Sequence, residues 1–328
     1  MKEPYELTII ISNYNQEKHI AETIDSALYQ RVNFPLKIIV ADDYSTKDHS
    51  REIIREYAER YENIEAILAT ENRGYLTNIL RAKAITKTKY FCLLDVDDYW
   101  TDRNFLQRAY DFLEEHNEYS IYESNVEVFD GINRHPCISP KRRSGTYSKE
   151  MFLNGEVVPI TQTTGMFLRN SIFINGIPRI MTEAVGTRSE RSFEGDTGRF
   201  TMHLKYGLAY YDSHIVGVYR LTENGIWNSL RESKKRIITA RMQMDYYSYY
   251  DSMAPIFINK AYKAFQRYLQ EKQHEFIALI REDEYIDEEE HLMVEDVYKF
   301  CKEHENDIFR EKNGLIDKAK QIYRIMRE

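Results

Sequence analysis

Cysteine and long apolar runs are scarce in this chain of 328 residues. The three cysteines, Cys92, Cys137 and Cys301, are widely spaced and form no metal-binding pair, which fits a reducing cytosol. No apolar stretch approaches the ~20 residues that a membrane span requires. The first six residues lack the pattern of a signal peptide. These absences predict a cytoplasmic protein without a membrane-spanning helix.

Excess positive charge and the common glycine-rich nucleotide motifs are also lacking. The formal net charge is −8, so we do not expect a nucleic-acid partner. No Gly-x-Gly-x-x-Gly follows the first predicted strand, and no Walker-type phosphate loop is present. A bound nucleotide would therefore be held by side chains and a metal ion. The 42% hydrophobic content is ample for a core.

Strand and helix patterns alternate over the first hundred residues. Short apolar runs predict strands over 7–11, 36–41, 64–69 and 90–94. Helical periodicity predicts helices over 17–29, 48–61 and 77–85, the second with Ser45 or Thr46 as its N-cap. Further along, 105–115 reads as a helix and 120–129 as a strand. This order predicts an α/β fold whose parallel sheet is covered on both faces.

A polar cluster follows each of the first four predicted strands, at 12–15, 42–43, 71–72 and 95–98. In open α/β sheets the ligand crevice lies beyond the carboxyl ends of the strands. Ordinary polar loops are the alternative, since any α/β domain has them. Acidic side chains recur at equivalent places, however, and this favours a binding site at one edge of the sheet.

The acidic cluster is densest at Asp95-Val96-Asp97-Asp98, directly after an apolar run. Three carboxylates this close repel one another unless a cation lies among them. Hard oxygen ligands suit Mg²⁺ or Mn²⁺, which also bind diphosphates. The alternative is an acidic turn that closes a strand. The metal interpretation predicts an activated, phosphate-bearing substrate.

The texture of the sequence changes near residue 230. Glycine nearly disappears, and helical patterns cover 257–280, 291–301 and 314–326. We therefore predict two domains, an α/β domain over 1–229 and a helical region over 230–328. The helical region could pack on the first domain, form a homodimer, or contact a membrane surface through the basic stretch 234–236.

Four motifs occur in order: 11–15 (Ile-Ser-Asn-Tyr-Asn), 41–46 (Ala-Asp-Asp-Tyr-Ser-Thr), 72–74 with Asn78 (Asn-Arg-Gly), and 94–100 (Leu-Asp-Val-Asp-Asp-Tyr-Trp). Together they resemble the family 2 inverting glycosyltransferases. The resemblance covers roughly residues 5 to 229 and not the helical tail. It implies the GT-A fold, a Rossmann-like nucleotide-diphospho-sugar transferase domain.

The resemblance also implies roles for particular residues. The predicted nucleotide-binding set consists of Ser12, Tyr14, Asp42, Asp43, Asn72, Asp95 and Arg220. In it, Asp43 would accept a hydrogen bond from uracil and Arg220 would pair with phosphate, although an arginine bonded within the core is an open alternative. Asp97 is the first candidate for the Mn²⁺ or Mg²⁺ ligand and Asp98 the second. Many relatives have a histidine at the position of Thr222, which weakens any claim for a protein ligand there.

An inverting transfer needs a carboxylate that takes the proton of the attacking hydroxyl. The stretch 193–197 (Phe-Glu-Gly-Asp-Thr) resembles the family segment that carries this base, with Asp196 as first choice and Glu194 as second. A Gly-Asp turn that caps a helix is the alternative for Asp196. The stretch 161–167 resembles the acceptor-side strand and loop of the family.

These expectations combine into a metal-dependent transfer of sugar from a UDP-linked donor to a hydroxyl. The acceptor would be a glycan or a lipid-linked intermediate of a bacterial surface polysaccharide, at the inner face of the membrane. A sugar-phosphate nucleotidyltransferase is one alternative, against which the missing glycine-rich, lysine-bearing loop argues. A non-catalytic glycan- or nucleotide-binding scaffold is the other, against which the intact carboxylate cluster argues.

Overall fold

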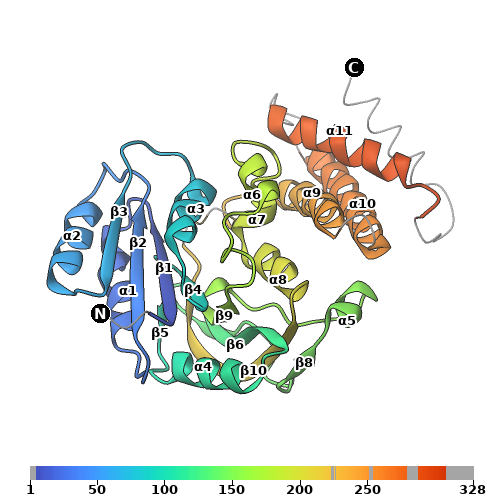
Figure 1. The fold of residues 1–328 in the computed structure, drawn as a ribbon. Helices are drawn as coiled ribbons and strands as arrows, with labels where there is room; N and C mark the ends of the chain where they lie inside the picture. Colours follow the sequence, from blue (N-terminus) through green and yellow to red (C-terminus); the bar gives the residue numbers. More distant parts are fainter. Residues whose placement is uncertain (1–4, 223–224, 226, 251–253, 279–286, 308–328) are drawn as a thin grey trace. The chain divides into compact units, whose positions relative to one another are not determined.

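The computed structural model describes residues 5–222, 225, 227–250, 254–278 and 287–307 (Figure 1). The chain forms two compact units. Unit 1 comprises residues 1–152, 156–185 and 193–222, and unit 2 comprises residues 153–155, 186–192 and 223–328. The chain thus passes into the helical unit at residue 223, and two short earlier segments also belong to that unit. The predicted helix over 314–326 lies outside the described residues.

Unit 1 opens with the predicted alternation. The elements are β1 (Leu7–Asn13), α1 (Glu17–Leu28), β2 (Leu36–Asp42), α2 (Ser50–Arg60), β3 (Ile64–Leu68), α3 (Tyr75–Ile85) and β4 (Tyr90–Asp95). Strands β3, β2, β1 and β4 are parallel neighbours. Helix α3 packs on β1 and β2, and α1 packs on β1 (Figure 1). This part of the fold confirms the prediction of a parallel α/β sheet.

One prediction about the second helix was wrong. Helix α2 begins at Ser50 with His49 as its N-cap, and neither Ser45 nor Thr46 caps it. The hydroxyl of Ser45 instead donates to Asp42 and accepts from the amide of Asn13. Residues after the second strand therefore stabilise the loop, and the helix starts later.

The second half of unit 1 completes the sheet. Its elements are β5 (Tyr99–Trp100), α4 (Phe105–Glu115), β6 (Tyr119–Phe129), β7 (Arg134–Pro136), β8 (Gly145–Tyr147), α5 (Lys149–Leu153), η1 (Thr163–Gly165), β9 (Met166–Arg169), α6 (Arg179–Ala184), α7 (Arg191–Glu194), α8 (Asp196–Leu204) and β10 (Leu208–Arg220). The sheet has the order β3-β2-β1-β4-β9-β6-β10-β5, with β7 on β6 and β8 on β10. Strand β9 is antiparallel to both β4 and β6, so the sheet is mixed beyond β4.

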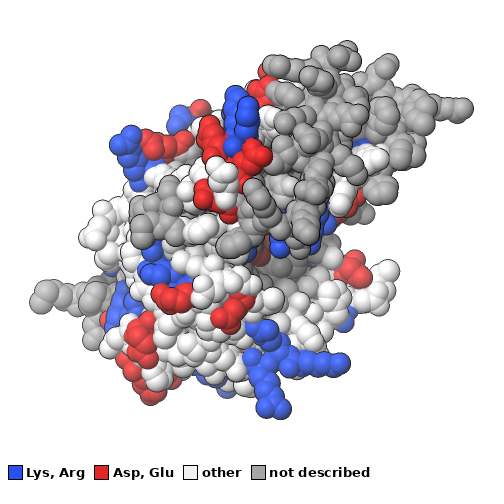
Figure 2. Space-filling model, turned by 90° about the vertical axis from the view of Figure 1, so that its right-hand side faces the viewer, with Lys and Arg blue, Asp and Glu red and all other residues white. Residues whose placement is uncertain are grey.

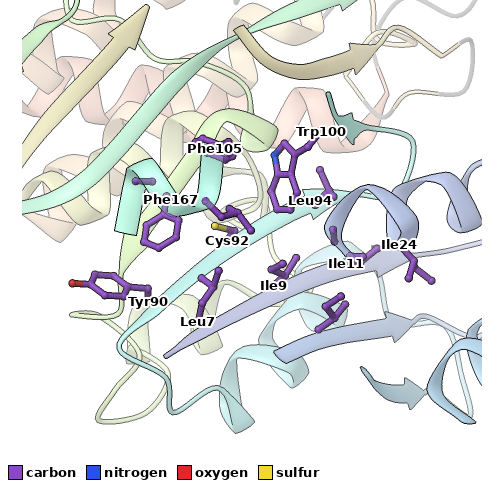
Figure 3. Close-up of a cluster of buried hydrophobic side chains, with 14 of the residues drawn as sticks. Leu7, Ile9, Ile11, Ile24, Tyr90, Cys92, Leu94, Trp100, Phe105 and Phe167 are labelled. Carbon is purple, nitrogen blue, oxygen red and sulfur yellow. The ribbon is translucent and has the colours of Figure 1, made fainter. Parts of the chain in front are cut away.

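Alternate residues of the central strands build the core on one face of the sheet. Leu7, Ile9 and Ile11 of β1 point to the same side as Tyr90, Cys92 and Leu94 of β4, where Ile24, Trp100, Phe105 and Phe167 meet them (Figure 3). The period of two in strands explains this pattern. Each such side chain stabilises the fold by about 1.5–3 kcal/mol through removal from water. The core thereby fixes the ends of β1 and β4.

Unit 2 contains α9 (Glu232–Tyr249), α10 (Pro255–Ala278) and α11 (Glu288–Glu303). These helices enclose their own apolar core, which includes Ile237, Phe265, Tyr268, Val297 and Phe300. No helix among the described residues is long and apolar enough to cross a bilayer.

On the face drawn in Figure 2, Lys and Arg side chains lie interspersed with Asp and Glu side chains, apart from one basic group near the lower edge.

Candidate functional site

The carboxyl ends of β1, β2 and β4 bring the predicted nucleotide-binding residues to one edge of the sheet. Ser12 is in register with Asp95 on one side, and Asn13 is in register with Asp42 on the other. Asp43 follows Asp42 directly, and its amide donates to the Asn13 carbonyl at 2.9 Å. Because parallel strands end at the same edge, residues from three distant stretches of sequence are adjacent here.

Asp42 is fully buried and turned into the protein. Its carboxylate accepts hydrogen bonds from Asn13 Nδ2 at 2.8 Å, from Arg51 Nη1 at 2.8 Å and from the Ser45 amide at 3.0 Å. A buried carboxylate with this many donors has few acceptor positions left. The visible role of Asp42 is to support the loop, and its predicted contact with the nucleotide stays a prediction.

Asp43 organises the start of α3. Its oxygens accept from the Gly74 amide at 2.7 Å, from the Arg73 amide at 3.1 Å and from Arg81 Nη2 at 3.3 Å. Gly74 has a φ of +87°, a conformation in which glycine is favoured. The carboxylate thus stabilises the loop that contains Asn72, whose own Oδ1 accepts from Gly74 at 3.2 Å. The acceptor positions of Asp43 are thus used within the protein in this structure. Its predicted contact with uracil stays a prediction.

The predicted nucleotide-binding residues Ser12, Tyr14 and Asn72 differ in exposure. Ser12 is buried, and its hydroxyl accepts from Asn78 Nδ2 at 2.9 Å. Asn78 also donates to the carbonyl of Ala41 at 2.7 Å, so it ties β1, β2 and α3 together. Tyr14 is 43% exposed, which leaves its ring open to a planar ligand. Asn72 is exposed as well.

The acidic turn after β4 has three carboxylates in three environments. Asp95 accepts from the hydroxyl of Tyr75 at 2.6 Å and is partly exposed. Asp97 is partly exposed and accepts from the Thr222 hydroxyl at 3.3 Å. Asp98 is fully buried, and its carboxylate accepts from the Arg220 amide at 3.0 Å and from the Thr164 hydroxyl. Of the two predicted metal ligands, Asp97 is therefore the one open to solvent.

Burial and mutual repulsion disfavour the charged forms of Asp97 and Asp98 in this turn. Burial, and then the charge of Asp95, raise the pKa of Asp97 to about 6. Burial, with Asp97 and Asp95 as neighbours, holds the pKa of Asp98 well above its ordinary value. A divalent cation beside Asp97 would offset this repulsion. The described residues contain no group of three or more His, Cys, Asp or Glu for a metal ion, but Mg²⁺-type sites often use one or two carboxylates plus substrate phosphates. The donor set fits such an ion.

Arg220 is bonded within the protein. Its guanidinium donates to the Asp97 carbonyl at 2.6 Å, forms an ion pair with Glu22, and lies 4.3 Å from the ring centre of Tyr99. These contacts match the alternative of an arginine bonded within the core. Its predicted pairing with phosphate stays a prediction, and its visible role is to hold the backbone of the acidic turn.

The predicted acceptor-side residues lie at the start of α8. Gly195 is the N-cap and Asp196 the first helical residue, so Asp196 does not cap the helix itself. Burial raises the pKa of Asp196 despite the opposing charge of Arg199, and the negative charge of Asp95 adds to the increase. The carbonyl of Glu194 accepts from Arg199 Nη1 at 2.7 Å.

Three polar residues of this region carry no motif and were missed from sequence. They are Tyr75, Arg199 and Glu123. Glu123 had a detectable signal, since it is a carboxylate within an otherwise buried strand. Its Oε2 accepts from the Thr161 amide at 3.1 Å, and its Oε1 is buried without a partner among the described residues. Burial raises the pKa of Glu123 to about 8, and the charge of Asp196 contributes.

Replacing Glu123 by glutamine is expected to flatten the pH dependence of stability. The folded protein holds the Glu123 proton up to about pH 8, whereas the unfolded chain releases it near 4.5. Its stabilisation is complete below the lower pKa and is lost as pH rises through the higher one, at up to about 1.4 kcal/mol per pH unit. Urea unfolding from pH 5 to 8 measures the slope, with the exposed Glu115→Gln as control. Equal slopes in wild type and Glu123→Gln would contradict this assignment.

Comparison with known proteins identifies the family. The model of glycosyl transferase family 2 matches residues 8–176, a little over half of the chain. The chain therefore belongs to glycosyl transferase family 2, and its fold is the GT-A fold with a helical C-terminal region. This confirms the resemblance that the four sequence motifs indicated.

Curated relatives match part of their own length. An uncharacterized protein of Mycobacterium tuberculosis is 37% identical over 240 residues, which cover 72% of this chain and 64% of that protein. A poly(ribitol-phosphate) beta-glucosyltransferase of Bacillus spizizenii is 36% identical over 128 residues, which cover 38% of this chain and 20% of that protein. The chain thus spans less than two thirds of these relatives.

Solved structures support the fold. Residues 1–349 of S. aureus TarS in complex with UDP-GlcNAc align with a TM-score of 0.65 at 16% identity, covering 97% of this chain and 88% of that one. The Pyrobaculum calidifontis mannosyltransferase PcManGT, in complex with GDP-Man and Mn²⁺, aligns with a TM-score of 0.51 at 15% identity, covering 100% and 92%. At these identities the likeness is one of fold.

Proposed function

We propose that this protein is a metal-dependent inverting glycosyltransferase that uses a UDP-linked sugar. The observation that carries the proposal is the acidic turn at the end of β4, where Asp97 stays partly exposed while Asp98 and Arg220 fix its backbone. Family membership supports glycosyl transfer over nucleotidyl transfer. A nucleotidyltransferase would release pyrophosphate, and a scaffold would release nothing.

In the proposed reaction, Asp97 would hold Mn²⁺ or Mg²⁺, and a bound ion would supply positive charge beside the leaving diphosphate. Asp95 contacts the ribose and is kept in place by the Tyr75 hydroxyl. The exposed ring of Tyr14 is open to the nucleobase, and Ser12 and Asn72 lie at the same edge of the sheet. Asp196 takes the proton from the acceptor hydroxyl as that oxygen attacks the anomeric carbon from the face opposite the nucleotide. A raised pKa suits this role, because it strengthens the carboxylate as a base.

The donor and acceptor rest on the relatives. TarS was solved with UDP-GlcNAc, which supports a UDP-sugar, whereas PcManGT was solved with GDP-Man. Relatives from Bacillus include teichoic and teichuronic acid biosynthesis proteins. They support a surface-polysaccharide acceptor, as a glycan or a lipid-linked intermediate.

We place the reaction at the inner face of the membrane, in contact with a lipid-linked acceptor. The basic stretch 234–236 is the predicted contact surface, and in this structure its lysines are paired within the helical unit. Lys234 pairs with Asp287 at 2.8 Å and with Glu289 at 3.0 Å, and Lys235 pairs with Glu232 at 2.7 Å. Co-sedimentation with vesicles that contain or lack the acceptor tests this placement. Light scattering tests the predicted homodimer through the helical region.

The donor class is tested by calorimetry with UDP, GDP and their sugars, in the presence and absence of Mn²⁺. We expect binding of UDP species that requires Mn²⁺, followed by release of UDP when donor and acceptor are both present. Release of pyrophosphate would indicate a nucleotidyltransferase. Absence of any metal-dependent nucleotide binding would exclude the transferase.

A further inference from the structure

The segment 161–165 (Thr-Gln-Thr-Thr-Gly) contacts both halves of the proposed site. It precedes β9 and ends in the 3₁₀ turn η1. Thr161, Thr163 and Thr164 are all buried. Buried hydroxyls need hydrogen-bond partners, and each of these three finds its partner in a different element.

Thr164 anchors the acidic turn. Its hydroxyl donates to Oδ2 of the buried Asp98, and its carbonyl accepts from Trp100 Nε1 at 2.7 Å. Both partners lie within three residues of Asp97 along the chain. The position of the acidic turn, residues 95–98, is thus tied to Thr164 by its side chain and its backbone carbonyl.

Thr163 anchors the acceptor-side helix. Its hydroxyl accepts from Arg199 Nη2 at 2.6 Å, and the same guanidinium donates through Nη1 to the Glu194 carbonyl at 2.7 Å. Arg199 belongs to α8, which begins at Asp196. Thr163 is therefore linked through the Arg199 side chain to the Glu194 carbonyl, two residues before Asp196.

Thr161 and Gly165 fix the segment itself on β6. Thr161 donates to Glu123 through its amide at 3.1 Å and its hydroxyl at 3.3 Å. A Cβ at Gly165 would collide with the carbonyl oxygen of Ser124, so the backbone approaches β6 as closely as glycine permits. These contacts fix the segment on β6, and its Thr163 and Thr164 side chains bond to the two sides of the proposed site.

We infer that Thr163 and Thr164 are positioning residues that set the separation between the metal-holding turn and the base Asp196. The inference rests on the proposed function and extends it to residues whose buried hydroxyls bond within the protein. An in-line transfer requires the acceptor oxygen, the anomeric carbon and the leaving oxygen at fixed spacing. Misplacement by about 1 Å can cost about 100-fold in rate.

Threonine-to-valine variants test the contacts of Thr163 and Thr164 separately, because valine keeps the shape of the side chain and removes the hydroxyl. Thr163→Val is expected to lower kcat about 10- to 100-fold and to leave the Kd of UDP with Mn²⁺ within about twofold. Thr164→Val is expected to weaken Mn²⁺-dependent UDP binding by about tenfold or more, since the buried Asp98 side chain loses the hydroxyl that holds it and the acidic turn in place. Thr163→Ser should restore kcat. Thr8→Val is the matched control, because the Thr8 hydroxyl is also buried and bonds to Thr88 at 2.8 Å near the amino end of β1, away from the proposed site; we expect a similar loss in Tm and unchanged kcat.

Hydrogen exchange of the 193–204 peptide supplies a readout that does not depend on activity. Thr163→Val should accelerate exchange at the start of α8, and Thr8→Val should not. Equal kcat in these two variants, or no rescue by Thr163→Ser, would overturn the inference. If the wild type transfers no sugar, the proposed function fails, and hydrogen exchange alone then decides whether Thr163 positions α8.

Discussion

Replacing Asp196 by asparagine is expected to lower kcat on the order of 100- to 10,000-fold, the usual contribution of a general base. Asparagine keeps the shape of the side chain and cannot accept the proton. Binding of UDP and Mn²⁺ should persist, because the residues of the acidic turn are unchanged. The measurement is turnover with a donor and acceptor pair, combined with calorimetry of UDP.

Two further variants make this result specific. Glu194→Gln tests the second candidate for the base and should cost less than Asp196→Asn. Asp130→Asn is a control of the same chemistry, because Asp130 is exposed and accepts from the backbone amides of Ile132 and Asn133 and from Asn133 Nδ2 within a turn. Full activity of Asp196→Asn would remove Asp196 as the base, and a loss confined to Glu194→Gln would move the role there.

Replacing Asp97 by asparagine is expected to abolish metal-dependent nucleotide binding. A bound metal ion supplies several kcal/mol of charge stabilisation, so the loss in kcat/KM should be at least about 100-fold. The fold should be kept, since Asp97 is partly exposed and only Thr222 donates to its carboxylate among the described contacts. Calorimetry of UDP with and without Mn²⁺, together with Tm, measures both effects.

Asp98→Asn separates the two candidate ligands. Asp98 is fully buried and bonded to Thr164 and to the Arg220 amide, so its loss should reduce Tm more than that of Asp97. If Asp98→Asn keeps its Tm and loses metal-dependent binding while Asp97→Asn keeps binding, the assignment of the metal to Asp97 is wrong.

The sequence was sufficient for the alternating elements of the first hundred residues and for the edge where they deliver polar residues. Apolar runs over 7–11, 36–41 and 90–94 predicted three parallel strands, and the observed register places their carboxyl ends side by side. This inference needs only local patterns, because the carboxyl ends of parallel strands coincide.

The orientation of adjacent carboxylates could not be predicted in this way. Asp97 and Asp98 are neighbours of the same type, yet one is open and the other is buried against Thr164 and Arg220, which lie 66 and 122 residues away in sequence. No local pattern contains those partners. Asp42 is turned inward for the same reason, because Arg51 and Asn13 reach it from other elements.

The contacts of Arg220 and Thr222 also decide when the site can form as the chain folds. Strand β10 is the last strand of unit 1, and it delivers bonds to Asp97, Asp98 and Glu22 across separations of up to 198 residues. Contacts so distant in sequence form late, since long loops must close first. A chain emerging from the ribosome would thus carry strands β1 to β4 long before its acidic turn acquires its final shape. Nucleotide and metal would stabilise the finished protein and offer little help to its early folding intermediates.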